Sequence, residues 1–91
     1  GSMGVFVRYQ NASNYYRFAL DKARGLRHLV KCVRGRTTVL FSEPFNYNNG
    51  VEYKLEIEVL GSRISVMLDG RSVCEVFDAD LINGCVGFYT W

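Results

Sequence analysis

The feature that most constrains this chain is a strict alternation of apolar and charged residues from Val51 to Val59. Every odd-numbered position in this segment is apolar, and every even-numbered position is charged. Successive side chains of a β-strand point to opposite faces, so the pattern predicts a strand with one buried face and one wet face. Helical periodicity is absent from the chain, and we therefore expect an all-β protein.

A tight hairpin is predicted directly after this strand. Gly61-Ser62 is a two-residue loop with glycine first, which suits a type II′ turn, and Arg63 to Leu68 would form the returning strand. Pairing Leu60 with Arg63 sets the register. It brings apolar side chains together on one face in three pairs, Val59–Ile64, Ile57–Val66 and Leu55–Leu68.

Asp69-Gly70 predicts a second tight turn, of the type I′ class, and a third strand after it. Simple pairing would turn Glu75 inward beside Ile64. We therefore expect a β-bulge near Cys74, because one extra residue would return Val76 to the apolar face.

The N-terminal half predicts further hairpins. Its strands are expected at residues 5–10, 14–20, 26–33 and 37–41, with a loop at 21–25 and a turn at Arg34-Gly35. Pairing Leu20 with Leu26 sets Phe18 opposite His28 on the inner face, and His28 opposite Phe41 on the next strand. With a closing strand at 84–91, the spacing predicts an antiparallel β-sandwich or jelly-roll of about eight strands joined mainly by hairpins.

Charge is divided unevenly along the chain. Residues 1–40 contain eight lysines and arginines against one acidic residue, whereas residues 41–91 contain three against eight. The favoured interpretation is that the two halves lie side by side and pair their charges. The alternative is a basic face for a polyanion such as nucleic acid or an acidic glycan; nucleic acid is not the partner we expect.

Cysteine and histidine use argues against a metal or disulfide framework. The three cysteines form no CxxC motif, and with the single His28 they make no plausible zinc set. We expect free thiols that pack as small hydrophobic groups, with one disulfide as the alternative in a secreted protein. No apolar run approaches the roughly 20 residues of a membrane helix.

Seven segments, taken in their order along the chain, resemble the sequence pattern of a known domain family. They are Val5–Gln10, Asn14–Asp21, Leu29–Lys31, Tyr53–Leu55, Ile64–Val66, Leu68–Gly70 and Gly84–Trp91. Together they resemble the second half of concanavalin A-like lectin/glucanase domains of the laminin G-like jelly-roll type. The resemblance implies a lectin-like sandwich and a secreted or cell-surface location. It does not define a function, because the superfamily includes lectins, hydrolases, lyases and adhesion modules.

The resemblance also bears on domain organisation. We interpret Gly1 to Met3 as residues left over from recombinant expression. Residues 4–91 are then one concanavalin A-like domain or half-domain. Such domains are roughly twice this length, so a half-domain would expose sheet edges that invite pairing with another copy. We therefore expect a homo-oligomer, most simply a dimer.

Four residues form the candidate site: Tyr15, Arg17, Lys31 and Trp91. In the expected register Tyr15 and Arg17 project outward beside Leu29 and Lys31. These side chains could stack a sugar ring and bond its hydroxyls, but the same residue types concentrate at subunit interfaces. Both interpretations stay open.

Other candidate chemistry has a simpler explanation. Glu56 and Glu58 share a face, as in a glycosidase pair, but they belong to a charged solvent stripe. Asp78 and Asp80 are candidate calcium ligands, although turn-forming carboxylates are favoured. No nucleophile is placed beside His28, so an enzyme is not expected.

The expected function is a non-catalytic carbohydrate-binding or adhesion-type β-sandwich module, with a glycan as the ligand. The alternative is a structural or oligomerisation fragment of a larger lectin-like domain that has no ligand of its own.

Overall fold

The fold is all-β, as the alternating pattern predicts. A computed structural model describes residues 3–46, 53–81 and 85–90, and these form eight strands. The strands are β1 (Met3–Asn11), β2 (Asn14–Asp21), β3 (Leu26–Val33), β4 (Arg36–Pro44), β5 (Leu55–Leu60), β6 (Arg63–Leu68), β7 (Arg71–Phe77) and β8 (Cys85–Thr90). Among the described residues there is no helix long and apolar enough to span a membrane.

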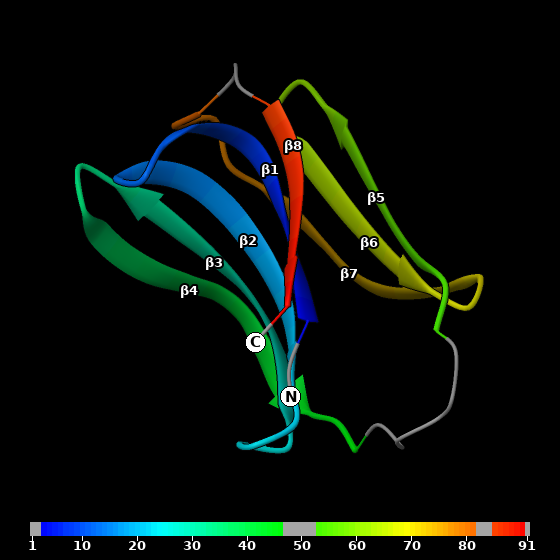
Figure 1. Ribbon diagram of the computed structural model, residues 1–91. Coiled ribbons are helices and arrows are strands. Elements are labelled where there is room, and N and C mark those ends of the chain that lie inside the picture. Colours follow the sequence, from blue (N-terminus) through cyan, green and yellow to red (C-terminus); the bar gives the residue numbers. More distant parts are fainter. Residues whose placement is uncertain (1–2, 47–52, 82–84, 91) are drawn as a thin grey trace.

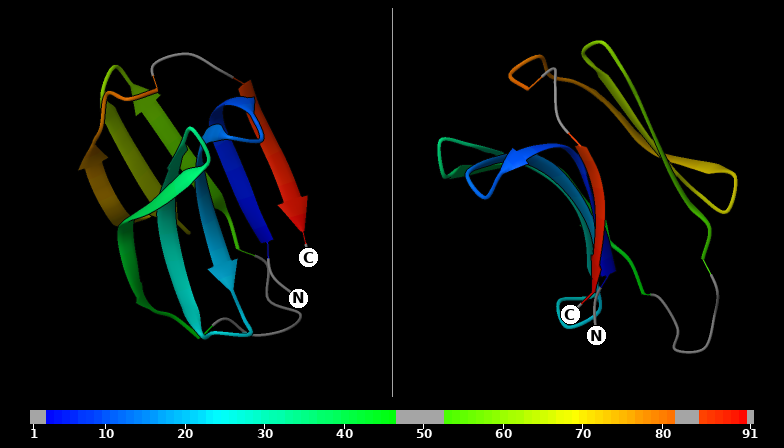
Figure 2. Two further views of the ribbon diagram at one scale, coloured as in Figure 1. Left: turned by 90° about the vertical axis from the view of Figure 1, so that its left-hand side faces the viewer. Right: turned by 45° about the horizontal axis from the view of Figure 1, so that its top comes forward.

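The strands form two antiparallel sheets that pack face to face. One sheet has the order β4-β3-β2-β1-β8, and the other has the order β5-β6-β7. Figures 1 and 2 show that the five-stranded sheet is curved, with its convex side toward the three-stranded sheet. Its other side, called the concave face below, is turned away from the second sheet. The predicted antiparallel β-sandwich is therefore confirmed.

The core lies between the sheets. Among the described residues, the ten buried side chains of the core come from both layers and from the segment after β7: Val5, Val7, Tyr16, Phe18, Leu20, Leu29, Ile64, Val66, Leu68 and Leu81. Along β2 the core residues are Tyr16, Phe18 and Leu20, which alternate as a strand requires. The residues between them must therefore face the concave side.

The three-stranded sheet has the register that its turns predict. Leu60 pairs with Arg63, and the three apolar pairs of the hairpin are those expected. Between β6 and β7 the register shifts at Val66, which pairs with Cys74, and Ile64 then pairs with Val76. The predicted bulge is confirmed, since Val73, Cys74 and Val76 all pack against the core.

The predicted register of β2 and β3 is wrong by one residue. Leu26 pairs with Asp21 rather than with Leu20, so the loop has four residues instead of five. The physical reason is the side chain of Asp21, which is buried and accepts a hydrogen bond from the backbone N–H of Arg24 at 3.1 Å. This Asx-type turn keeps Asp21 in the strand. A shift of one residue moves every side chain of β3 to the opposite face from that expected.

The observed register of β2 and β3 changes the position of His28. It lies opposite Ala19 on the concave face, and not opposite Phe18 in the core. On β4 it pairs with Ser42 instead of Phe41, because the β3–β4 register shifts between Leu29 and Val30. The expected pair of Val30 with Val39 is confirmed.

A bulge in β1 also prepares the concave face. The register of β1 shifts after Val7, and Arg8 has a left-handed backbone with φ of 49°. The Arg8 guanidinium reaches the second layer, where its Nη1 donates to the carbonyl of Gly61 at 2.7 Å. The bulge therefore lets Val7 and Arg8 both point inward. Tyr9 falls outside the core set and contacts aromatic rings of the concave face.

Candidate functional site

Tyr15 and Arg17 project from β2 on the concave face. They alternate with the core residues Tyr16 and Phe18, so they point away from the second sheet. Both side chains are half-buried. Their outward orientation is the one expected from sequence, and their role as binding residues stays a prediction.

Three aromatic rings form a cluster at one end of this face. Phe6 meets Tyr15 edge to face with ring centroids 5.0 Å apart, and it meets Tyr9 in the same way at 5.2 Å. Tyr9 and Tyr15 are stacked, with centroids 5.8 Å apart and an interplanar angle of 22°. Such contacts hold the rings in fixed orientations, and the result is a rigid apolar platform with two hydroxyl groups.

Arg17 lies at the centre of the concave face. Its neighbours across the sheet are Phe6 on β1 and Val30 on β3. The Arg17 Nε is buried and has no hydrogen-bond partner. None of the ion pairs formed by the described residues includes Arg17. The buried Nε therefore lacks the hydrogen bond that such donors ordinarily make.

His28 lies on the other side of Arg17 from the aromatic cluster. It is 8% exposed, and its Nε2 is buried without a hydrogen-bond partner. Burial lowers the pKa of His28 below its usual 6.5, and the positive charge of Arg17 lowers it further. At neutral pH the imidazole is therefore uncharged and can serve as a hydrogen-bonding group.

Asp21 lies at the end of β2 on this side of the site, but its own bonds are already made. Its Oδ1 accepts from the Arg24 backbone, and its Oδ2 lies 3.7 Å from the Arg24 Nε. Beyond His28 the face borders a pocket of about 340 Å³, whose lining includes Leu26 and Ser42. Ser42 is the strand partner of His28, so this pocket adjoins the site.

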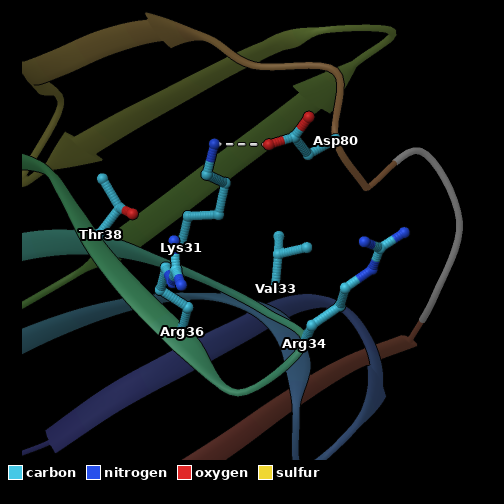
Figure 3. A pocket seen from close by; sticks show the side chains of 6 residues that line it. All are labelled: Lys31, Val33, Arg34, Arg36, Thr38 and Asp80. Atoms are coloured by element: carbon cyan, nitrogen blue, oxygen red, sulfur yellow. Dashed lines mark hydrogen bonds and ion pairs between the residues drawn. The ribbon is translucent and has the colours of Figure 1, made fainter.

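Lys31 does not belong to the concave face, which corrects the sequence-based grouping with Tyr15 and Arg17. The register places it opposite Tyr16, on the inward side of the sheet. Its Nζ donates to the Oδ2 of Asp78 at 2.8 Å and of Asp80 at 2.6 Å. Figure 3 shows Lys31 reaching toward Asp80 at a pocket of about 400 Å³. The fourth candidate, Trp91, lies outside the described residues.

In this arrangement the carboxylates of Asp78 and Asp80 both bind the ammonium group of Lys31. Burial alone would raise the pKa of Asp78, but hydrogen bonds from Lys31 and Tyr16 outweigh it and hold that pKa below 3.8. The Tyr16 hydroxyl donates to Asp78 Oδ1 at 2.5 Å. Among the described residues, no three His, Cys, Asp or Glu side chains are grouped as a metal site requires.

Glu56 and Glu58 lie on the solvent side of β5. Glu56 is 3.2 Å from the Nζ of Lys54, and Glu58 accepts from Arg63 at 2.6 Å. Their side chains are 42% and 55% exposed, which agrees with the expected wet strand face.

Sequence reasoning missed Phe6, Tyr9 and His28 as site residues. Phe6 has a local signal, because it alternates with the core residues Val5 and Val7 and must face the other side. Tyr9 has no such local signal, because the β1 bulge is what places it on this face. His28 was displaced by the one-residue error in the β3 register.

Comparisons with known proteins add one structural relative. No protein-family model and no curated protein matches the chain. A solved structure described as the carbohydrate-binding module CBM66 from Bacillus subtilis superposes with a TM-score of 0.88 at 25% sequence identity. The match covers 100% of this chain and 57% of that chain, so this chain spans little more than half of its length. The likeness supports a lectin-like β-sandwich, and it does not single out the concanavalin A-like or laminin G-like type.

Proposed function

We propose that this chain is a carbohydrate-binding β-sandwich module whose ligand lies on the concave face of the five-stranded sheet. The observation that carries the proposal is the pair of buried polar atoms without partners, Arg17 Nε and His28 Nε2, next to an aromatic cluster. The structural likeness to a carbohydrate-binding module supports the same conclusion.

The energetics favour a ligand at this position. A buried polar group without a partner destabilises a protein by roughly 1–3 kcal/mol. Two such groups on one face are explained if a small side-chain movement lets a ligand hydroxyl or carboxylate complete their bonds. The rings of Tyr15 and Phe6 add the apolar surface that pyranose rings stack on. The arrangement therefore offers both parts of a sugar site.

The same face supports a non-catalytic role. Glycoside hydrolysis ordinarily uses two carboxyl groups on either side of the bond that breaks. Asp21 is the carboxylate that the described β2 and β3 strands place near Arg17 and His28, and it is paired with Arg24. We therefore propose binding without cleavage.

The test is a glycan array followed by calorimetry on the best ligand. Tyr15→Ala, Arg17→Gln and His28→Phe should each weaken binding by about tenfold or more, a loss of about 1.4 kcal/mol each. His28→Phe keeps a ring in place and removes the ring nitrogens. Arg71→Gln is the matched control, because Arg71 is an exposed arginine on β7 in the other sheet. Equal binding by all four variants would place the ligand elsewhere, and an array without a ligand would contradict the proposal.

The second candidate is a structural module that assembles with itself, most simply as a homodimer. Leu60 and Phe77 are 60% and 68% exposed, and both neighbour Arg63 in one row across the three-stranded sheet. Two large apolar side chains in one exposed row favour contact with a second copy. Light scattering after gel filtration should then show a dimer that Phe77→Lys dissociates. A monomer at every concentration would leave this candidate without support.

A further inference from the structure

The charge of Arg17 is not balanced by any group that the structure places around it. On the neighbouring strand β3 the lysine and arginine have carboxylate partners, since Arg27 pairs with Glu43 and Lys31 with Asp78. Arg17 forms no ion pair with a described residue, although its side chain is half-buried and its Nε is fully enclosed. Taking a cation partly out of water without a counter-charge is unfavourable, and an anion at this position would remove that penalty.

The described residues that face Arg17 supply no free counter-charge. On β3 and β2 it faces His28, which is uncharged at neutral pH, and Tyr15, whose pKa is raised by burial and which therefore keeps its proton. On β4 the outward residues of the adjoining positions are uncharged: Thr37, Val39 and Ser42. Residues 85–90 of β8 include no acidic residue. Asp21, at the end of β2, is bonded to Arg24.

We propose that the ligand of this face is an acidic saccharide whose carboxylate is bound by Arg17. The inference rests on the proposed carbohydrate-binding function and names the class of sugar. A guanidinium presents parallel N–H donors that match the two oxygens of a carboxylate. None of the ion pairs among the described residues uses the guanidinium of Arg17. A neutral hydroxyl would accept a hydrogen bond from Arg17 but would leave its charge unbalanced.

The spacing on β2 fits a carboxylate attached to a sugar ring. Tyr15 and Arg17 are two residues apart on one strand, a separation of about 7 Å, which is close to the size of one ring. A ring against the Tyr15–Phe6 platform therefore brings its carboxylate to Arg17. His28 lies beyond Arg17 as seen from the platform, so it adjoins the carboxylate end of the ligand.

Matched pairs of acidic and neutral ligands test this inference. The probes are oligogalacturonate with its methyl ester, and sialyllactose with lactose, measured by calorimetry or NMR titration. We expect at least one acidic member to bind about tenfold or more tightly than its neutral partner. Arg17→Gln should abolish that preference, and Arg17→Lys should restore part of it, because it keeps the charge without the fork of donors.

Each outcome decides between the two proposals. Equal binding of acidic and neutral members would overturn the acidic class and leave carbohydrate binding standing. A preference that survives Arg17→Gln but disappears in Arg36→Gln would overturn the role of Arg17, since Arg36 lines the separate pocket beside Lys31. No binding by any member of the pairs, together with an empty glycan array, would contradict both. Thermal unfolding of each variant checks that a lost preference does not reflect a lost fold.

Discussion

At the scale of single residues, the charge of His28 is set by where it lies. A histidine in water has a pKa of 6.5, but this one is 92% buried next to a cationic arginine. Both burial and the neighbouring charge disfavour the protonated ring. The same two conditions keep the His28 ring uncharged at neutral pH.

We predict that acid weakens the fold through His28. The unfolded chain takes up a proton near pH 6.5, whereas folded His28 does so at lower pH, so unfolding is coupled to proton uptake between those values. The free energy of unfolding should therefore fall as the pH drops below about 6.5, and less so in His28→Phe. Urea unfolding between pH 5 and 8 measures this. The chain has one histidine, so NMR titration reads its pKa directly, and a value of 6.5 or above would contradict the prediction.

At the scale of elements, tight turns determine the register of the three-stranded sheet. Asp69 and Gly70 both have left-handed backbones, with φ of 52° and 77°, as a type I′ turn requires. The Asp69 N–H donates to the carbonyl of Lys54, and its Oδ1 accepts from the Lys54 N–H, both at 2.8 Å. The turn therefore also positions the start of β5.

Gly70→Ala should lower the free energy of unfolding by roughly 1 kcal/mol. A Cβ at Gly70 would meet no atom within 4 Å, so the effect is that of the left-handed backbone and not of a clash. Chemical denaturation of the variant and of Ser72→Ala, an exposed control on β7, gives the comparison. An unchanged midpoint in Gly70→Ala would mean that the turn tolerates side chains and does not hold the register.

The two sheets also differ in how well the sequence predicts their strand register. In β5 to β7, polar residues face water, so alternation and turn chemistry agree on the register. In β2 and β3, both faces carry buried residues, since Ala19 and Val30 are buried on the concave face while Phe18 and Leu29 are buried in the core. Hydrophobicity then does not distinguish the faces, and the loop length decides the register.

At the scale of the whole molecule, a polar network joins the two layers near the end of β7. Lys31 and Tyr16 project from the five-stranded sheet and bind Asp78, which follows β7. The Tyr16 hydroxyl also accepts from the backbone N–H of Leu81 at 3.2 Å. The uneven charge of the two halves of the chain is explained in part here, because a basic strand meets an acidic segment.

High pH should weaken this polar network between the two sheets. Burial raises the pKa of Tyr16 to about 12, and its hydrogen bond to Asp78 adds to the shift. An unfolded tyrosine loses its proton near pH 10, so between about pH 10 and 12 only the unfolded state ionises and stability falls as the pH rises. We predict that the free energy of unfolding, measured with urea between pH 9 and 11.5, falls more steeply with pH in the wild type than in Tyr16→Phe. Tyr16→Phe should also be less stable at neutral pH by about 1–2 kcal/mol, because Asp78 and Leu81 lose a partner. Parallel pH profiles for the two proteins would contradict the buried network.

The sequence by itself determined the all-β class, the sandwich, most of the hairpins, and the register and bulge of β5 to β7. These features depend on local properties, namely the period of two in polarity and the left-handed backbone that glycine turns provide. It also identified Tyr15 and Arg17 as residues that face away from the core.

Only the tertiary structure decided which residues share the concave face. Lys31 points inward because its counter-charges, Asp78 and Asp80, come from a segment 47 and 49 residues away. His28 joins Arg17 because the Asp21 side chain shortens a loop by one residue. Such contacts depend on side-chain bonds across the fold, and no periodicity in the sequence records them. For that reason the candidate site emerged from the packing of the sheets rather than from a motif.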